Sequence, residues 1–162
     1  YVPYSDFKKI DEKLLHKILH INLEAPFYIS TKLYELLKKG HKKHHNAQII
    51  NIASVAGMSG TGSNLIYTSS KGAIITFTKA LAKTIKPIKV NSISPGLIKT
   101  NFVKFPKKYY IEMGKKTPVQ KFGVPEDISS VVEFLLENKY ITGQNIVVDG
   151  GRMLIWKKFV QL

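Results

Sequence analysis

Three side chains that could do chemistry lie close together in the sequence: Ser54, Tyr67 and Lys71. Tyr67 and Lys71 are four residues apart, so on a helix they share one face. A phenol exchanges protons poorly at neutral pH, but a nearby ammonium group stabilises its phenolate form. A hydroxyl such as that of Ser54 could hydrogen-bond a substrate oxygen while Tyr67 exchanges a proton with it. The combination predicts proton transfer to a carbonyl or from an alcohol.

Two elements and a loop must position these groups. The segment Gln48 to Ala53 is apolar enough for a buried strand of a parallel sheet, and Ser54 follows at its carboxyl end. A glycine-rich loop comes next. A helix is then expected from about Asn64 to Ile85, because apolar residues recur along one side of it and Pro87 ends it. This arrangement predicts that Ser54 faces the first turns of the helix.

A Tyr-x-x-x-Lys pair by itself is more often a surface pair than a site. Here Asn-Ile-Ala-Ser-x-x-Gly precedes it, thirteen residues separate Ser54 from Tyr67, and the pair reads Tyr-x-x-Ser-Lys. Together these motifs resemble the active-site segment of the short-chain dehydrogenase/reductases. The resemblance implies that Tyr67 is the acid/base and that Ser54 binds the substrate oxygen. It also implies that Lys71 assists Tyr67 and binds the nicotinamide ribose.

The first expected helix runs from Asp11 to about Lys39, with Gly40 as its stop signal. Pro26 should kink or open it just after Asn22, because proline lacks a backbone N–H. In the resembled family an asparagine of the corresponding helix holds a water that relays protons to the lysine, and Asn22 matches that place. The alternative is a polar residue tolerated at a kink.

A second strand is expected from Lys89 to Ser94, and Pro95-Gly96 turns the chain at its carboxyl end, where doubly wound sheets bind ligands. In the resembled family a Pro-Gly-x-x-x-Thr segment lies against the nicotinamide. The resemblance therefore implies an NADP or NAD cofactor bound by Tyr67, Lys71 and four residues of this segment: Pro95, Gly96, Ile98 and Thr100.

The rest of the chain completes an α/β pattern. The segment from Asn101 to Thr117 is basic, aromatic and weakly periodic, which predicts a mobile lid. A third helix should begin at Pro125, and a third strand at Asn145. We expect residues 1–162 to form a single domain, the C-terminal part of a doubly wound parallel-sheet Rossmann fold. The third helix, which begins at Pro125, should bury an apolar stripe made of Ile128, Val131, Val132, Leu135 and Leu136.

One part of the family pattern is missing from the sequence. The Thr-Gly-x-x-x-Gly-x-Gly phosphate loop and the Asn-Asn-Ala-Gly strand do not occur, and the resemblance places them upstream of Tyr1. Gly57, Gly60 and Gly62 have the spacing G-x-x-G-x-G, which is not the dinucleotide fingerprint. They are expected to let the loop pass close to a substrate. Preference between NADP and NAD cannot be read without the phosphate-binding portion.

Composition limits the other classes. The 162 residues are 44% hydrophobic, contain no cysteine and show no apolar run of about 20 residues, which favours a cytoplasmic globular domain without membrane spans. The net charge is +14, but Arg152 is the only arginine, so nucleic-acid recognition is disfavoured. A lysine-rich solvated surface, or docking of an acidic or phosphorylated partner, is favoured. His16 and His20 have metal-ligand spacing without a third ligand, so no metal site is predicted.

These observations predict an NAD(P)H-dependent oxidoreductase that reduces a small or acyl-carrier-bound carbonyl substrate, most similar to the 3-oxoacyl-carrier-protein reductases. The segment around Asn22 and the ending Asp-Gly-Gly-Arg leave a pteridine reductase-like member of the family as an alternative. A second alternative is a binding or scaffolding protein that kept the fold without catalysis. The resemblance also implies a homodimer or homotetramer that pairs through the helices beginning near Asp11 and Asn64.

Overall fold

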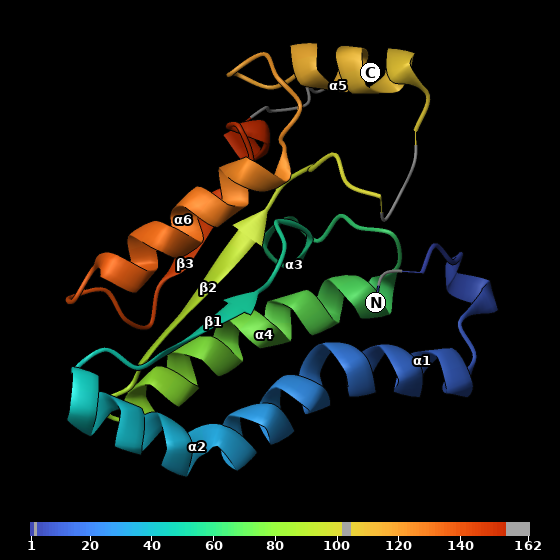
Figure 1. Ribbon diagram of the computed structural model, residues 1–162. Helices are drawn as coiled ribbons and strands as arrows, with labels where there is room; N and C mark the ends of the chain where they lie inside the picture. Colours follow the sequence, from blue (N-terminus) through green and yellow to red (C-terminus); the bar gives the residue numbers. More distant parts are fainter. Residues whose placement is uncertain (2, 102–104, 155–162) are drawn as a thin grey trace.

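A three-stranded parallel sheet forms the centre of the computed structural model, which describes residues 1, 3–101 and 105–154. Its strands are β1 (Gln48–Ile52), β2 (Lys89–Pro95) and β3 (Asn145–Val148), and they lie side by side in chain order (Figure 1). Ile52 pairs with Ile93, so β1 and β2 end at the same edge. The predicted parallel arrangement is confirmed, and the strand ends bring the segments around Ser54 and Pro95 together.

Helices cover both faces of this sheet. One face carries α4 (Leu65–Thr84), with α1 (Glu12–Leu19) and α2 (Ala25–His44) packed outside it, and α6 (Pro125–Glu137) covers the opposite face (Figure 1). Short elements lie between them: α3 (Ala56–Ser59), α5 (Lys107–Lys115) and the 3₁₀ turns Phe7–Lys9 and Arg152–Leu154. The architecture is an α/β fold with a parallel sheet, as predicted from the alternation of strands and helices.

The first long helix agrees with the expectation at its middle and differs from it at its end. Asp11 caps its start by accepting the backbone N–H of Leu14 at 2.7 Å. A π-helical turn, His20–Glu24, separates α1 from α2, which confirms the expected opening before Pro26. The stop at Gly40 was wrong. A glycine inside a helix costs only about 1 kcal/mol, and the helix continues to His44, where His45 ends it in a left-handed conformation (φ 53°).

The core lies around β2, the middle strand. Val90 and Ile93 are fully buried, and Ile74 of α4 and Leu135 of α6 pack on opposite faces. The expectation that β1 is buried holds only in part, since its first four residues are half-buried and Ile52 is 49% exposed. The reason is position, because β1 pairs only with β2 among the described residues and forms an edge of the sheet.

The glycine-rich loop is also more ordered than expected. Its first residues form the short helix α3, and Gly57 packs directly on α4: a Cβ there would lie 2.4 Å from the backbone nitrogen of Gly72. Gly57 therefore permits close packing of α3 against α4, instead of the close approach to a substrate that the sequence suggested. Gly60 ends α3 with a positive φ of 74°.

Two remaining expectations concern the second half of the chain. In α6, Leu135 is buried but Leu136 is 45% exposed, so the predicted stripe is wrong at Leu136. Part of the expected lid forms helix α5, while residues 102–104 lie outside the described residues. No helix among the described residues is long and apolar enough to cross a membrane.

Candidate active site

Lys71 lies at the carboxyl end of β1. Its Nζ donates a hydrogen bond to the backbone carbonyl of Ile52 at 2.8 Å, which ties α4 to the strand end. No carboxylate of the described residues forms an ion pair with it. Burial lowers the pKa of Lys71 below its ordinary value, because the charged form loses water contacts. An ammonium group without an acidic partner is thus held beside the strand end.

Tyr67 lies one helical turn before Lys71, near the start of α4. Asn64 fixes this start, since its side-chain oxygen accepts the backbone N–H of Tyr67 at 2.8 Å. The Nζ of Lys71 is 5.9 Å from the centre of the Tyr67 ring. The shared helix face that the four-residue spacing predicted is therefore present.

Ser54 follows β1 directly and faces the same region. Its Oγ accepts the backbone N–H of Ala56 at 3.1 Å, which leaves the hydroxyl proton able to bond an incoming oxygen. The next residue, Val55, donates its backbone N–H to the carbonyl of Pro95 at 3.2 Å. Ser54 is therefore held between the first turn after β1 and the Pro-Gly turn after β2.

Asn22 lies in the π-helical turn and is only 5% exposed. Its side-chain nitrogen donates to the backbone carbonyl of Tyr1 at 2.9 Å and to Oγ of Ser70 at 3.1 Å, and Ser70 in turn donates to the carbonyl of Tyr67 at 2.7 Å. Asn22 thus contacts α4 beside Lys71 without lining the cleft described below. Pro26 has no N–H to offer the Asn22 carbonyl, so this oxygen lacks its normal helical partner.

The Pro-Gly turn after β2 is held against the end of β3. Gly96 donates its N–H to the carbonyl of Val148 at 2.9 Å, and a Cβ on Gly96 would lie 2.7 Å from the Cβ of Asp149. Only glycine allows the two chains to approach this closely. Beyond the turn, Ile98 pairs with Gly123 in an isolated parallel bridge, which places the segment at the start of α6.

One cleft of about 620 Å³ collects nearly all the residues that the sequence singled out. Asn22 is the exception, as described above. The other wall of the cleft comes from α6 and was not expected from the sequence. A sequence signal for this wall existed. The helix predicted to start at Pro125 is the next helix predicted after the Pro95-Gly96 turn, and it could have been expected to lie beside that turn. The predicted residues lining the cleft are Ser54, Tyr67, Lys71, Pro95, Gly96, Ile98 and Thr100, and the additional ones from α6 and its start are Pro125, Ile128, Ser129 and Val132.

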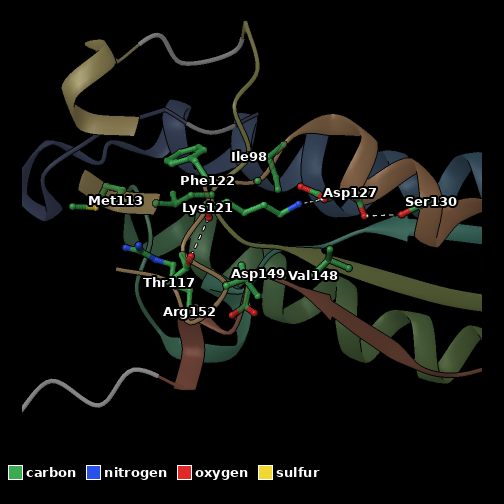
Figure 2. Close-up of a pocket in the computed structure, with 14 residues that line it drawn as sticks. Ile98, Met113, Thr117, Lys121, Phe122, Asp127, Ser130, Val148, Asp149 and Arg152 are labelled. Carbon is green, nitrogen blue, oxygen red and sulfur yellow. Dashed lines mark hydrogen bonds and ion pairs between the residues drawn. The ribbon is translucent and has the colours of Figure 1, made fainter. Parts of the chain in front are cut away.

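A smaller cavity of about 230 Å³ lies on the other side of Ile98 (Figure 2). Its lining comes from the segment after β2, from α5 and the loop after it, from α6 and from the end of β3. Lys121 and Asp127 form an ion pair of 2.7 Å there. Ile98 lines both this cavity and the cleft, and none of Ser54, Tyr67 and Lys71 lines the cavity.

The remaining histidine expectation concerns His16 and His20. Each lies near a glutamate one turn away, at 3.5 Å from Glu12 and 3.0 Å from Glu24 respectively. Among the described residues no group of three or more His, Asp or Glu side chains is arranged to hold a metal ion.

Comparison with known proteins gives consistent matches. A family model described as enoyl-(acyl carrier protein) reductase matches residues 1–152. The 3-oxoacyl-[acyl-carrier-protein] reductase of Rickettsia prowazekii is 35% identical over 144 residues, which are 86% of this chain and 58% of that protein. The human protein (Homo sapiens) of the same name is 37% identical over 115 residues, or 70% of this chain and 48% of that protein. The chain thus spans about half the length of these curated relatives.

Solved structures match as well. A 4-hydroxyisoleucine dehydrogenase complexed with NADH superposes with a TM-score of 0.84 at 32% identity, over 96% of this chain and 66% of that one. The family model covers most of the sequence, and the sheet order and helix packing agree with the Rossmann fold of these neighbours. The chain belongs to the short-chain dehydrogenase/reductase family.

Proposed function

We propose that the full protein is an NAD(P)H-dependent reductase of a carbonyl substrate, similar in activity to the 3-oxoacyl-carrier-protein reductases. The observation that supports it most is the cleft that joins Ser54, Tyr67 and Lys71 with the Pro-Gly turn. Both alternatives from the sequence remain as rivals. A pteridine reductase-like enzyme would use the same cleft with another substrate. A binding or scaffolding protein would not use the cleft for catalysis.

The cleft residues fit a nicotinamide cofactor. Gly96 presents no side chain to the cleft, Ile98 and Thr100 line the wall beyond it, and Lys71 faces them from α4. We assign Tyr67, Lys71, Pro95, Gly96, Ile98 and Thr100 to cofactor binding. The cofactor would supply a hydride to the carbonyl carbon. The choice between NADPH and NADH stays open, and the phosphate-binding portion is proposed to lie upstream of Tyr1.

The residues of this chain would carry out the proton half of the reaction. Ser54 hydrogen-bonds the carbonyl oxygen and holds it near Tyr67. As the oxygen gains negative charge, the Tyr67 hydroxyl gives it a proton, and the ammonium of Lys71 stabilises the resulting phenolate. Asn22 would anchor a relay water near Lys71 through the π-helical turn, where its own carbonyl has lost a helical partner.

Replacement of Tyr67 by phenylalanine tests the proposal. In the full-length protein kcat should fall by about 10²-fold or more, since a positioned acid contributes on that scale. Cofactor affinity should change little, because the ring is retained. Tyr140→Phe is the matched control, as Tyr140 is 98% exposed and does not line the cleft. Near-normal turnover by Tyr67→Phe would exclude Tyr67 as the proton donor.

We also propose that two copies pair through α2 and α4. Apolar side chains are exposed along α2, which is the pattern of an isologous contact. Sedimentation of the full-length protein should give the mass of a dimer or tetramer at micromolar concentration, and a monomer mass would contradict the pairing. The exposed apolar residues of α2 are Phe27, Tyr28, Ile29, Leu33 and Leu36.

A further inference from the structure

Arg152, the only arginine in the chain, lies between two cavities on the side of the Pro-Gly turn away from α4. It lines the smaller cavity of Figure 2 and also a neighbouring hollow of about 520 Å³. This second hollow begins at Val55, the residue that follows Ser54. Its lining residues come from the loop after β1, from α5 and from the turn after β3: Val55, Ser59, Thr61, Met113, Lys116, Arg152 and Met153.

The guanidinium of Arg152 has no acidic partner among the described residues. Asp149, three residues before Arg152, uses its two carboxylate oxygens to accept the backbone N–H groups of Gly151 and Met153, each at 2.8 Å. In Figure 2 the Arg152 side chain extends away from that carboxylate. A half-buried arginine keeps its charge and a rigid set of donors that match carboxylate and phosphate oxygens. Its donors are therefore available to a ligand.

A series of contacts connects Arg152 to Val55, the residue that follows Ser54 in the proposed catalytic cleft. The Val55 N–H bonds the Pro95 carbonyl at 3.2 Å, and Gly96 packs directly on Asp149. The backbone N–H of Arg152 then bonds the Asp149 carbonyl at 3.2 Å. This series fixes the position of Arg152 relative to Ser54. The hollow begins at Val55, one residue after Ser54, and we place there the part of a substrate that extends away from the reacting carbonyl.

The remaining lining residues define the chemistry of the group that fits. Lys116, at the end of α5, adds a second positive charge without an ion-pair partner in the described part of the chain. The hydroxyls of Ser59 and Thr61 hydrogen-bond each other at 2.8 Å, which leaves one of their two protons for a ligand. Val55, Met113 and Met153 supply apolar surface. Two cations with apolar walls fit an anionic group attached to a short carbon chain.

We propose that the substrate of this reductase carries an anionic group, a carboxylate or a phosphate, and that Arg152 binds it in the hollow beside Val55, with Lys116 as the second cation. This inference rests on the proposed function, since it names the class of carbonyl that the same site would reduce. Arg152 acts on substrate selection and takes no part in proton transfer.

Matched substrates test the proposal on the full-length protein. Turnover of 3-oxobutanoate is compared with that of its methyl ester, and dihydroxyacetone phosphate with dihydroxyacetone, each with NADPH and with NADH. In Arg152→Met the KM for the preferred anion should rise by about tenfold or more, since a hydrogen bond to a charged group is worth that much. The kcat and the KM for its neutral counterpart should stay unchanged. The pair that responds identifies the anion as carboxylate or phosphate.

Two further variants separate charge from structure. Arg152→Lys keeps the charge and should restore part of the loss, whereas Lys115→Met removes a neighbouring charge outside the hollow and should change nothing. An equal change for the anionic and neutral substrates, or no change for either, would overturn the proposal. If the wild-type protein reduces no carbonyl, the proposed function fails. Calorimetry with butanoate and inorganic phosphate then decides the inference separately: it requires binding of one of them that Arg152→Met abolishes.

Discussion

Two lysines adjoin the two cavities around Ile98, and their surroundings differ. In the larger cleft, Nζ of Lys71 donates to the backbone carbonyl of Ile52 at 2.8 Å. Lys71 has no acidic partner in the described part of the chain. Lys121 in the smaller cavity donates to Asp127 at 2.7 Å. The other oxygen of Asp127 accepts the backbone N–H of Val124 at 2.9 Å and so caps α6. The charge of Lys121 is thus paired with a carboxylate, whereas that of Lys71 has no carboxylate partner among the described residues.

The directions of the pKa shifts follow from this difference. Burial lowers the pKa of Lys71, since nothing acidic compensates for the lost water. The hydrogen bond from Lys121, helped by the N–H of Val124, lowers the pKa of the Asp127 carboxyl. A buried ammonium without an acidic partner lowers the free energy of unfolding. Such a cost is common at functional sites.

The largest effect is expected for Lys71→Met. If the ammonium stabilises the phenolate of Tyr67, its loss should lower kcat by about 10²-fold or more. Cofactor affinity should fall as well, because Lys71 is assigned to the ribose. Steady-state kinetics on the full-length protein measure both, and a circular dichroism melt shows whether the variant folds. Unchanged kcat in a folded variant would contradict the distinction between the two lysines.

A smaller effect concerns stability at alkaline pH. The folded-state pKa of Lys71 lies below the ordinary 10.5, so its charged form costs folding free energy at neutral pH. That cost disappears as the pH rises from the lowered pKa to 10.5. The free energy of unfolding of the wild type should therefore rise, relative to that of Lys71→Met, across this window. Urea titrations at several pH values measure the difference, and a falling difference would contradict the account.

The smallest effect is expected for Lys121→Met. Turnover should remain within about twofold of the wild type, because an exposed ion pair contributes little and the cleft is untouched. The melting temperature should fall slightly. The pKa of Asp127 is lowered below 3.8, so this loss should be present above pH 3.8 and disappear as the pH falls through the lowered pKa. A large loss of turnover would assign Lys121 a catalytic role.

Most of this fold could be predicted from the sequence, because local signals agreed with the final structure. The π-helical opening near Asn22 follows from Pro26 alone, and the sheet order follows from the strand and helix pattern. The end of α2 could not be predicted. The helix ends at a left-handed residue, but that residue is His45 and not the glycine at position 40. The exposure of β1 follows from its place at the edge of the sheet, which the missing Asn-Asn-Ala-Gly strand of the family pattern already indicated.

The candidate site was predicted at the level of residue identity but not of contacts. The spacing of Tyr67 and Lys71 gave their shared face, yet the bond from Lys71 to a backbone carbonyl has no sequence signature. The same holds for Ser70, which links Asn22 to α4. In the sequence Arg152 counts against nucleic-acid binding and ends the Asp-Gly-Gly-Arg motif, and neither feature indicates that it lines a cavity. Its place beside the hollow appears only when β3 packs on the Pro-Gly turn.

The central claim is that Tyr67 and Lys71 act as one proton-transfer unit, and a double-mutant cycle tests it most directly. The kcat of full-length Tyr67→Phe, Lys71→Met and the double variant would be measured on the same carbonyl substrate. If the ammonium acts through the phenol, the double variant should be within about threefold of the slower single variant, because residues that work together show strongly non-additive effects. If the two losses instead multiply in the double variant, Tyr67 and Lys71 act independently and the account is contradicted.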